Sequence, residues 1–177
     1  MINFEGAVNN IEKKLDYPAE LEQMLGLSPV IDQIEKKFDV FVKEKEIERK
    51  SQGEELPKDS ELSTLSLIKL FIAKNHEFMQ EVTKDTAIYG FDCMSMSVTT
   101  CLLANRKGFK VKIGRPDKFS RYCHALILRG NGSVFKITGK RTDYEVKEMY
   151  LKDVQNRIKY IKPVVNFVNS VTKKLKK

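Results

Sequence analysis

The chain has 177 residues, of which 41% are hydrophobic and 32% are charged, and its formal net charge is +8. This length supports one well-buried core and is too short for two full-sized domains with independent cores. The composition excludes low-complexity and collagen-like proteins. No apolar stretch approaches the roughly 20 residues that cross a bilayer, and residues 1–10 lack the apolar run of a secretory signal. We therefore expect one soluble, cytoplasmic domain without a membrane partner.

The positive charge is spread along the chain rather than gathered in one surface. Acidic residues alternate with basic ones, as in residues 44–50, and the clearest basic run is formed by Lys173, Lys174, Lys176 and Lys177. No aromatic interleaving or recognised nucleic-acid motif accompanies the basic residues. We interpret the charge as a solvated face, and a nucleic-acid partner is the less favoured alternative.

The three cysteines, Cys93, Cys101 and Cys123, lie within about thirty residues of one another. An odd number confined to one region is a poor disulfide framework, and it is compatible with a reducing compartment and one reactive thiol. Cys101 and Cys123 need no role beyond that of small buried residues.

The first predicted helix starts at Ser28, as N-cap, with Pro29 at the first helical position. Its apolar face is spaced by three and four residues and consists of Ile31, Ile34, Phe38 and Phe41. The polar stretch 51–60 is predicted to be a linker. We therefore assign residues 1–58 to a helical N-terminal extension and linker.

A second helix, apolar on several sides, is expected from Leu62 to about Lys84. Asp92 then has the character of an N-cap, which makes Cys93 the first residue of a third helix. Gly108 ends that helix. The pattern thus places a cysteine at a helix N-terminus.

Strand periodicity follows, with Phe109, Val111 and Ile113 alternating with lysines. Further strands are expected over about 122–128 and 134–138, joined by a two-residue type I′ turn at Asn131-Gly132. These elements predict an α+β domain, with residues 59–145 as its core.

The remainder, residues 146–177, is predicted to be a helical segment with a basic tail. Thr142 and Glu145 form a capping box that starts a helix near Asp143. A heptad-like stripe follows, with a kink at Pro163, and it comprises Leu151, Val154, Ile158, Ile161, Val165, Val168 and Leu175. The stripe either packs against the domain or mediates the formation of a homo-oligomer.

The order of loop, Cys93, helix, strand and strand with His124 has a chemical use. A helix N-terminus lowers the pKa of a thiol, and its amides can hold an oxyanion. A histidine on a nearby strand can accept the thiol proton and return it to a leaving group. The 31 residues between Cys93 and His124 (124 − 93) suffice for the chain to fold back.

Three runs resemble a known family: Tyr89 to Cys93, Gly108 to Val111, and Cys123 to Ala125. They are similar to the core of the transglutaminase-like superfamily of cysteine peptidases and acyltransferases, over about residues 85–140. The resemblance implies a cysteine-bearing helix packed on a small antiparallel sheet. It also implies Cys93 as the nucleophile, the Cys93 amide in the oxyanion hole and His124 as general base, with no metal or cofactor.

Where that family has an aspartate after the histidine, this chain has Thr138. A threonine hydroxyl can fix the tautomer of His124 but cannot offset an imidazolium charge. A two-residue loop at Asn131-Gly132 turns Thr138 away from the face of His124, and a three-residue loop brings it back. Asp143 is the alternative acid, although the capping box already explains it.

These features predict a thiol hydrolase or acyl transferase that acts on an amide or isopeptide bond of a protein or peptide. The alternative is a catalytically silent domain of the same fold that binds a protein partner. A zinc site from Cys93, Cys123 and His124 is disfavoured, because neighbouring strand residues point to opposite faces and no Cys-x-x-Cys pair exists. His76 is expected at the surface.

Overall fold

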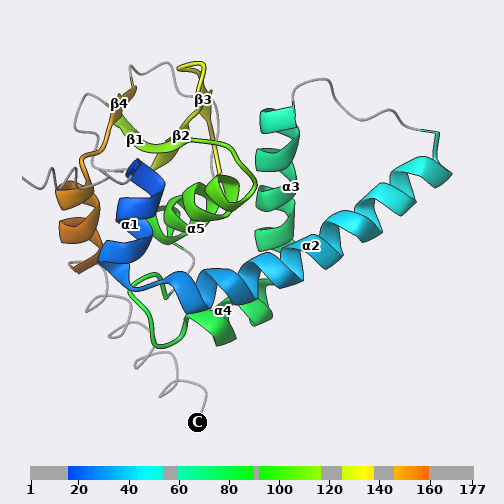
Figure 1. Ribbon diagram of the computed structural model, residues 1–177, viewed down its shortest axis with the longest axis horizontal. Coiled ribbons are helices and arrows are strands. Elements are labelled where there is room, and N and C mark those ends of the chain that lie inside the picture. The colour runs from blue at the N-terminus through cyan, green and yellow to red at the C-terminus, as the bar shows by residue number, and fades with distance from the viewer. Residues whose placement is uncertain (1–15, 54–59, 90–91, 117–124, 138–145, 160–177) are drawn as a thin grey trace, which may run out of the picture.

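The computed structural model describes residues 16–53, 60–89, 92–116, 125–137 and 146–159. Within these ranges helices surround one side of an antiparallel sheet, which confirms the expected α+β class. Figure 1 shows the sheet on one side of the central helix and the other labelled helices around its remaining sides. No helix of the described residues is long and apolar enough to cross a membrane.

The central helix, α5, runs from Cys93 to Arg106 and is almost completely buried. Contacts reach it from helices on several sides and from two strands of the sheet. Asp92 caps its start, as predicted, and Gly108 follows its end with φ of 87°. A positive φ is unfavourable for residues that carry a Cβ, so Gly108 allows the chain to turn back there.

Two helices precede residues 59–145, the predicted core region: α1 (Tyr17–Leu25) and α2 (Ser28–Ser51). Gly26 adopts the left-handed conformation between them. The predicted apolar face of α2 is buried, with Ile31, Ile34, Phe38 and Phe41. The expected cap was wrong: Leu27 is the N-cap and Ser28 the first helical residue, because buried Leu27 already has helical dihedral angles and its carbonyl accepts the Ile31 amide.

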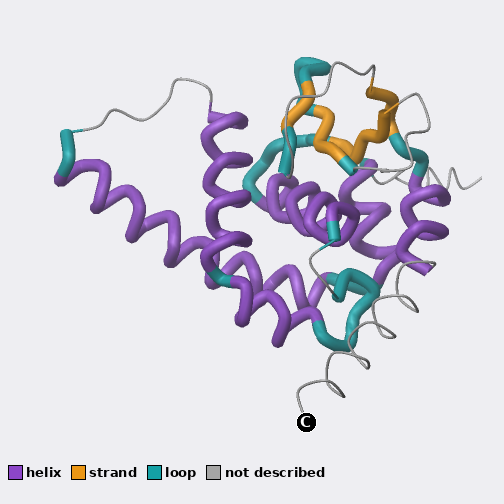
Figure 2. The backbone as a smooth tube through the Cα atoms, turned by 180° about the vertical axis from the view of Figure 1, so that it is seen from behind, coloured by secondary structure: helices purple, strands orange, loops and turns teal. Residues whose placement is uncertain are grey.

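The C-terminal half of α2 extends away from the other elements in both backbone views (Figures 1 and 2). Ile47, on this half, is 70% exposed. Charged residues dominate here, and Lys45 pairs with Glu48 one turn away. This part of α2 is therefore supported mainly by its own helical contacts.

The helix expected from Leu62 to Lys84 is broken in two. The structure has α3 (Ser60–Lys74) and α4 (His76–Thr83). Asn75 separates them, because its backbone is not helical and its side-chain amide donates to the Phe71 carbonyl at 2.9 Å. This local hydrogen bond competes with the continuing helix, as asparagine often does.

The sheet has the strand order β3-β2-β1-β4, and every neighbouring pair is antiparallel. Its strands are β1 (Lys112–Pro116), β2 (Leu126–Leu128), β3 (Val134–Phe135) and β4 (Val146–Glu148). β1 therefore begins three residues later than predicted and extends to Pro116. Pairing with two strands at once sets these bounds, which local alternation does not reveal.

The loop between β2 and β3 has three residues rather than two. Arg129 donates its amide to the Ser133 carbonyl, and only Gly132 in this loop has a positive φ, of 81°. The predicted type I′ turn would also need a positive φ at Asn131. The loop instead combines a turn with a left-handed glycine, the common three-residue form.

Residues 146–148 are a strand, which contradicts the helix expected to continue from Asp143. Their pairing with β1 satisfies a sheet edge that would otherwise be open. A helix does occupy residues 151–159. Its Leu151, Val154 and Ile158 pack into the same hydrophobic cluster as Ile31 of α2, so all three predicted regions contribute to one core.

Candidate functional site

Cys93 is the first residue of α5, directly after its cap. Asp92 Oδ1 accepts the backbone amides of Met94 at 2.8 Å and Ser95 at 3.0 Å. Asp92 Oδ2 accepts the Ser95 hydroxyl at 2.7 Å. The Cys93 side chain is partly exposed. The local part of the predicted site is therefore formed as expected, with a cysteine at a capped helix N-terminus.

The cap has an electrostatic consequence for that cysteine. The helix dipole favours negative charge at the first turn, and the Asp92 carboxylate already supplies one there. A second negative charge, on a Cys93 thiolate, would lie next to it. The positive end of the helix dipole and a negative charge therefore lie side by side at Cys93.

Two buried hydroxyls lie behind Cys93 on the same face of α5. Ser97 and Thr100 follow it by four and seven residues, and both are 0% exposed. Their hydroxyl oxygens have no hydrogen-bond partner in the part of the chain that the structure describes. Their spacing of four and seven residues from Cys93 is the sequence signal that points to them.

Cys101 is a structural residue. It is fully buried, and its thiol donates to the Val111 carbonyl at 3.3 Å. Burial, and secondarily the negative charge of Asp16, raise the pKa of Cys101 far above its usual range. Its thiol thus stays protonated and closed off, as predicted for a small buried residue.

His124, Thr138, Cys123 and Asp143 lie outside the described residues. The hairpin that precedes Thr138 is described, and it pairs Ile127 with Phe135. This register belongs to the three-residue loop. It is the arrangement in which Thr138 was expected on the face of His124.

One face of the sheet packs in the hydrophobic core. Ile113 and Ile127, which pair across β1 and β2, are both 0% exposed. The next pair along, Lys112 and Leu128, lies on the opposite face, where Lys112 is exposed. Leu126, on that opposite face, is also buried, but only Ile113 and Ile127 belong to the hydrophobic cluster that includes residues of α5, so their face is the one turned toward the cysteine-bearing helix.

Ion pairs anchor the other end of α5. Arg106 donates to buried Glu22 of α1 and also pairs with Asp32 of α2. Lys107 pairs with Glu35 and Asp39 of α2. These partners are 68 to 84 residues away in the sequence (107 − 39 and 106 − 22), so local patterns did not predict them. They orient α5 against the N-terminal helices.

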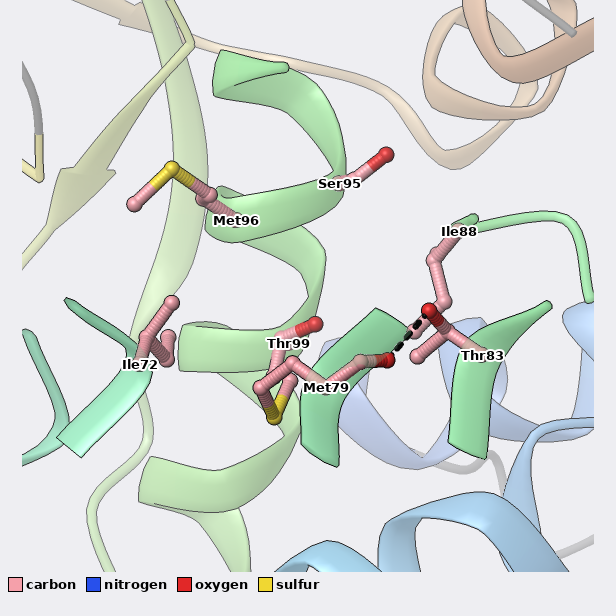
Figure 3. A pocket seen from close by; sticks show the side chains of 7 residues that line it. All are labelled: Ile72, Met79, Thr83, Ile88, Ser95, Met96 and Thr99. Carbon is pink, nitrogen blue, oxygen red and sulfur yellow. Dashed lines mark hydrogen bonds between the residues drawn. The ribbon is translucent and has the colours of Figure 1, made fainter. Parts of the chain in front are cut away.

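A small cavity lies beside the second turn of α5, toward α3 and α4 (Figure 3). It measures about 10 Å³, and it is lined by Ile72, Met79, Thr83, Ile88, Ser95, Met96 and Thr99. Such a volume holds about one water molecule. This volume is too small for a peptide substrate, so the cavity is not a substrate pocket for Cys93.

The second histidine, His76, is exposed at the start of α4, in agreement with its expected surface position. Within the described ranges, no three histidine, cysteine or acidic side chains converge as metal ligands would. The arrangement can supply one thiol, a capped helix terminus and buried hydroxyls behind it. Comparisons of the chain with protein-family models, curated proteins and solved structures find no match.

Proposed function

We propose that the chain is a thiol hydrolase or acyl transferase with Cys93 as its nucleophile, acting on an amide or isopeptide bond of a protein or peptide. The observation that carries the proposal is the position of Cys93, partly exposed at the first residue of a buried helix packed on an antiparallel sheet. The second strand after this helix, β2, begins two residues after His124. This is the order that the resemblance to the transglutaminase-like superfamily implies.

The reaction has two steps. His124 takes the thiol proton, and the Cys93 sulfur attacks the carbonyl carbon to form a tetrahedral oxyanion held by the Cys93 amide. The C–N bond breaks, His124 gives the proton to the leaving amine, and a thioester remains. Water or a second amine then attacks the thioester and regenerates the thiol.

Thr138 is proposed to orient His124 in place of the usual aspartate. The described hairpin register supports this role, since the same register continued from Ile127 and Phe135 would place positions 124 and 138 opposite each other. Strand alternation also sets a requirement. In a regular strand, position 124 would share the face of Leu126 rather than that of Ile127, which is turned toward α5. Contact between His124 and Cys93 therefore requires a change of backbone direction before β2.

A second function, a silent domain that binds a protein partner, is favoured by the Asp92 cap. Its carboxylate takes the amides of Met94 and Ser95 and places a negative charge beside Cys93. Both effects oppose a thiolate. In this case Cys93 would behave as an ordinary thiol.

Iodoacetamide labelling at pH 7, resolved by residue, separates the two functions. An activated Cys93 should be alkylated at least about tenfold faster than Cys123, because only the thiolate reacts. Cys101 should react slowly and serves as the internal reference, since it is buried. Equal rates at Cys93 and Cys123 would exclude the enzyme proposal.

A further inference from the structure

The hydroxyl of Ser97 is buried without an evident use in the fold. Ser97 is 0% exposed, and its Oγ has no hydrogen-bond partner among the described residues. Leaving a buried hydroxyl in this state is unfavourable. Thr83 shows the usual solution on another helix, where its hydroxyl donates to the Met79 carbonyl one turn earlier at 2.7 Å (Figure 3).

Helix geometry places the Ser97 side chain next to that of Cys93, although the Ser97 hydroxyl does not bond the Cys93 sulfur in the structure. Residues four apart in a helix are neighbours, with Cβ atoms about 5–6 Å apart. Each Cα–Cβ bond also tilts toward the helix N-terminus. Ser97 therefore leans toward the residue one turn before it, which is Cys93, while Thr100 lies a further turn away on the same face.

We propose that Ser97 is a positioning residue whose hydroxyl donates a hydrogen bond to the Cys93 thiolate. This inference rests on the proposed function, because it assigns a role toward the same nucleophile. A thiolate is a charged acceptor, and hydrogen bonds to charged groups are stronger than those between neutral groups. The hydroxyl would thus gain its partner when Cys93 ionises.

The charges described around α5 indicate what this hydrogen bond would do for Cys93. Asp92 places a negative charge beside Cys93. The ion pairs that α1 and α2 make with α5 lie at its opposite end, on Arg106 and Lys107. His124 is the proposed cationic partner from the strand side. On α5 itself, the Ser97 hydroxyl would supply a donor that offsets the effect of Asp92.

The test compares Ser97→Ala with Thr100→Val, using the rate of iodoacetamide labelling of Cys93 across pH 5 to 10. Both variants remove one buried hydroxyl without a described partner, and alanine preserves the helix. Ser97→Ala should move the pH midpoint of labelling upward by about one unit, the order of effect of one hydrogen bond to a charged group. Thr100→Val should leave the midpoint unchanged.

The inference is overturned if Ser97→Ala keeps the wild-type midpoint, or if both variants shift it equally. Ser97→Thr, which keeps a hydroxyl at this position, should have a midpoint closer to the wild-type value than Ser97→Ala has. The proposed function is judged separately, from the labelling of wild-type Cys93 against Cys123. The effect of Ser97 is the difference in the pH midpoint of Cys93 labelling between wild type and Ser97→Ala. This difference can be measured whether or not Cys93 is activated in the wild-type chain.

Discussion

Asp92 and Ser95 are joined by two hydrogen bonds, from the Ser95 amide to Oδ1 at 3.0 Å and from its hydroxyl to Oδ2 at 2.7 Å. Both carboxylate oxygens are therefore held at the first turn of α5. Cys93 lies between these residues in the sequence. The cap that starts the helix thus also places a charge directly before the proposed nucleophile.

Replacing Asp92 should separate its structural effect from its electrostatic effect. Asp92→Asn keeps an oxygen acceptor, and asparagine caps helices about as well as aspartate, whereas Asp92→Ala should lower the free energy of unfolding by about 1 kcal/mol. Asp92→Asn should also shift Cys93 labelling to lower pH, because a negative charge beside the thiol is removed. Unchanged labelling in Asp92→Asn would show that the carboxylate does not influence the thiol.

Cys101 should make the fold sensitive to alkaline pH. Burial raises its pKa in the folded chain, while in the unfolded chain the pKa is about 8.5. The unfolded chain alone therefore releases this proton as pH rises past about 8.5. The stability that Cys101 contributes is complete below that pH and declines above it, until the folded-state pKa is reached, by about 1.4 kcal/mol per pH unit.

Urea unfolding of wild type and Cys101→Ala at pH 8 and pH 10 measures this effect. The variant removes the thiol, so its free energy of unfolding should fall less between the two pH values than that of wild type. The expected difference is about 2 kcal/mol. The same change in both chains would mean that Cys101 does not titrate on unfolding.

Gly114 leaves room over β1 for the side chains of Val146 and Leu128. A Cβ at this position would lie 2.6 Å from Val146 Cγ1 and 2.9 Å from Leu128 Cγ. Gly114→Ala should therefore lower the free energy of unfolding by about 1–3 kcal/mol, the usual cost of overpacking. The measurement is chemical denaturation.

The matched control for Gly114→Ala is the same change combined with Val146→Ala. Removing Val146 Cγ1 makes room for the new methyl group, so the effect of Gly114→Ala should be smaller in that background. Strictly additive effects of the two substitutions would show that the contact with Val146 is not the source of the cost.

Elements set by local interactions could be predicted from the sequence. The Asp92 cap needs only the amides of the next two or three residues, and the apolar face of α2 follows from the spacing of Ile31, Ile34, Phe38 and Phe41. The start of β1 and the strand at Val146–Glu148 could not be predicted, because both depend on pairing between distant segments. The break at Asn75 reflects a side-chain hydrogen bond that competes with the helix.

The candidate site divides in the same way. The position of Cys93 at the start of α5 is local and was predicted correctly. The burial of Ser97 depends on what packs against α5, and the pairing of Arg106 with Glu22 joins residues 84 apart in the sequence. The roles of His124 and Thr138 likewise depend on tertiary placement, and they stay predictions.

The central claim is a thiol activated by a histidine, and the most direct test is the pH profile of Cys93 alkylation with and without His124→Ala. His76→Ala is the matched control, because His76 is the chain's other histidine and is exposed. We predict that wild type and His76→Ala label rapidly below pH 7 and that His124→Ala moves the midpoint upward. Identical profiles in all three chains, with a midpoint near the ordinary thiol value of about 8.5, would contradict the proposed function.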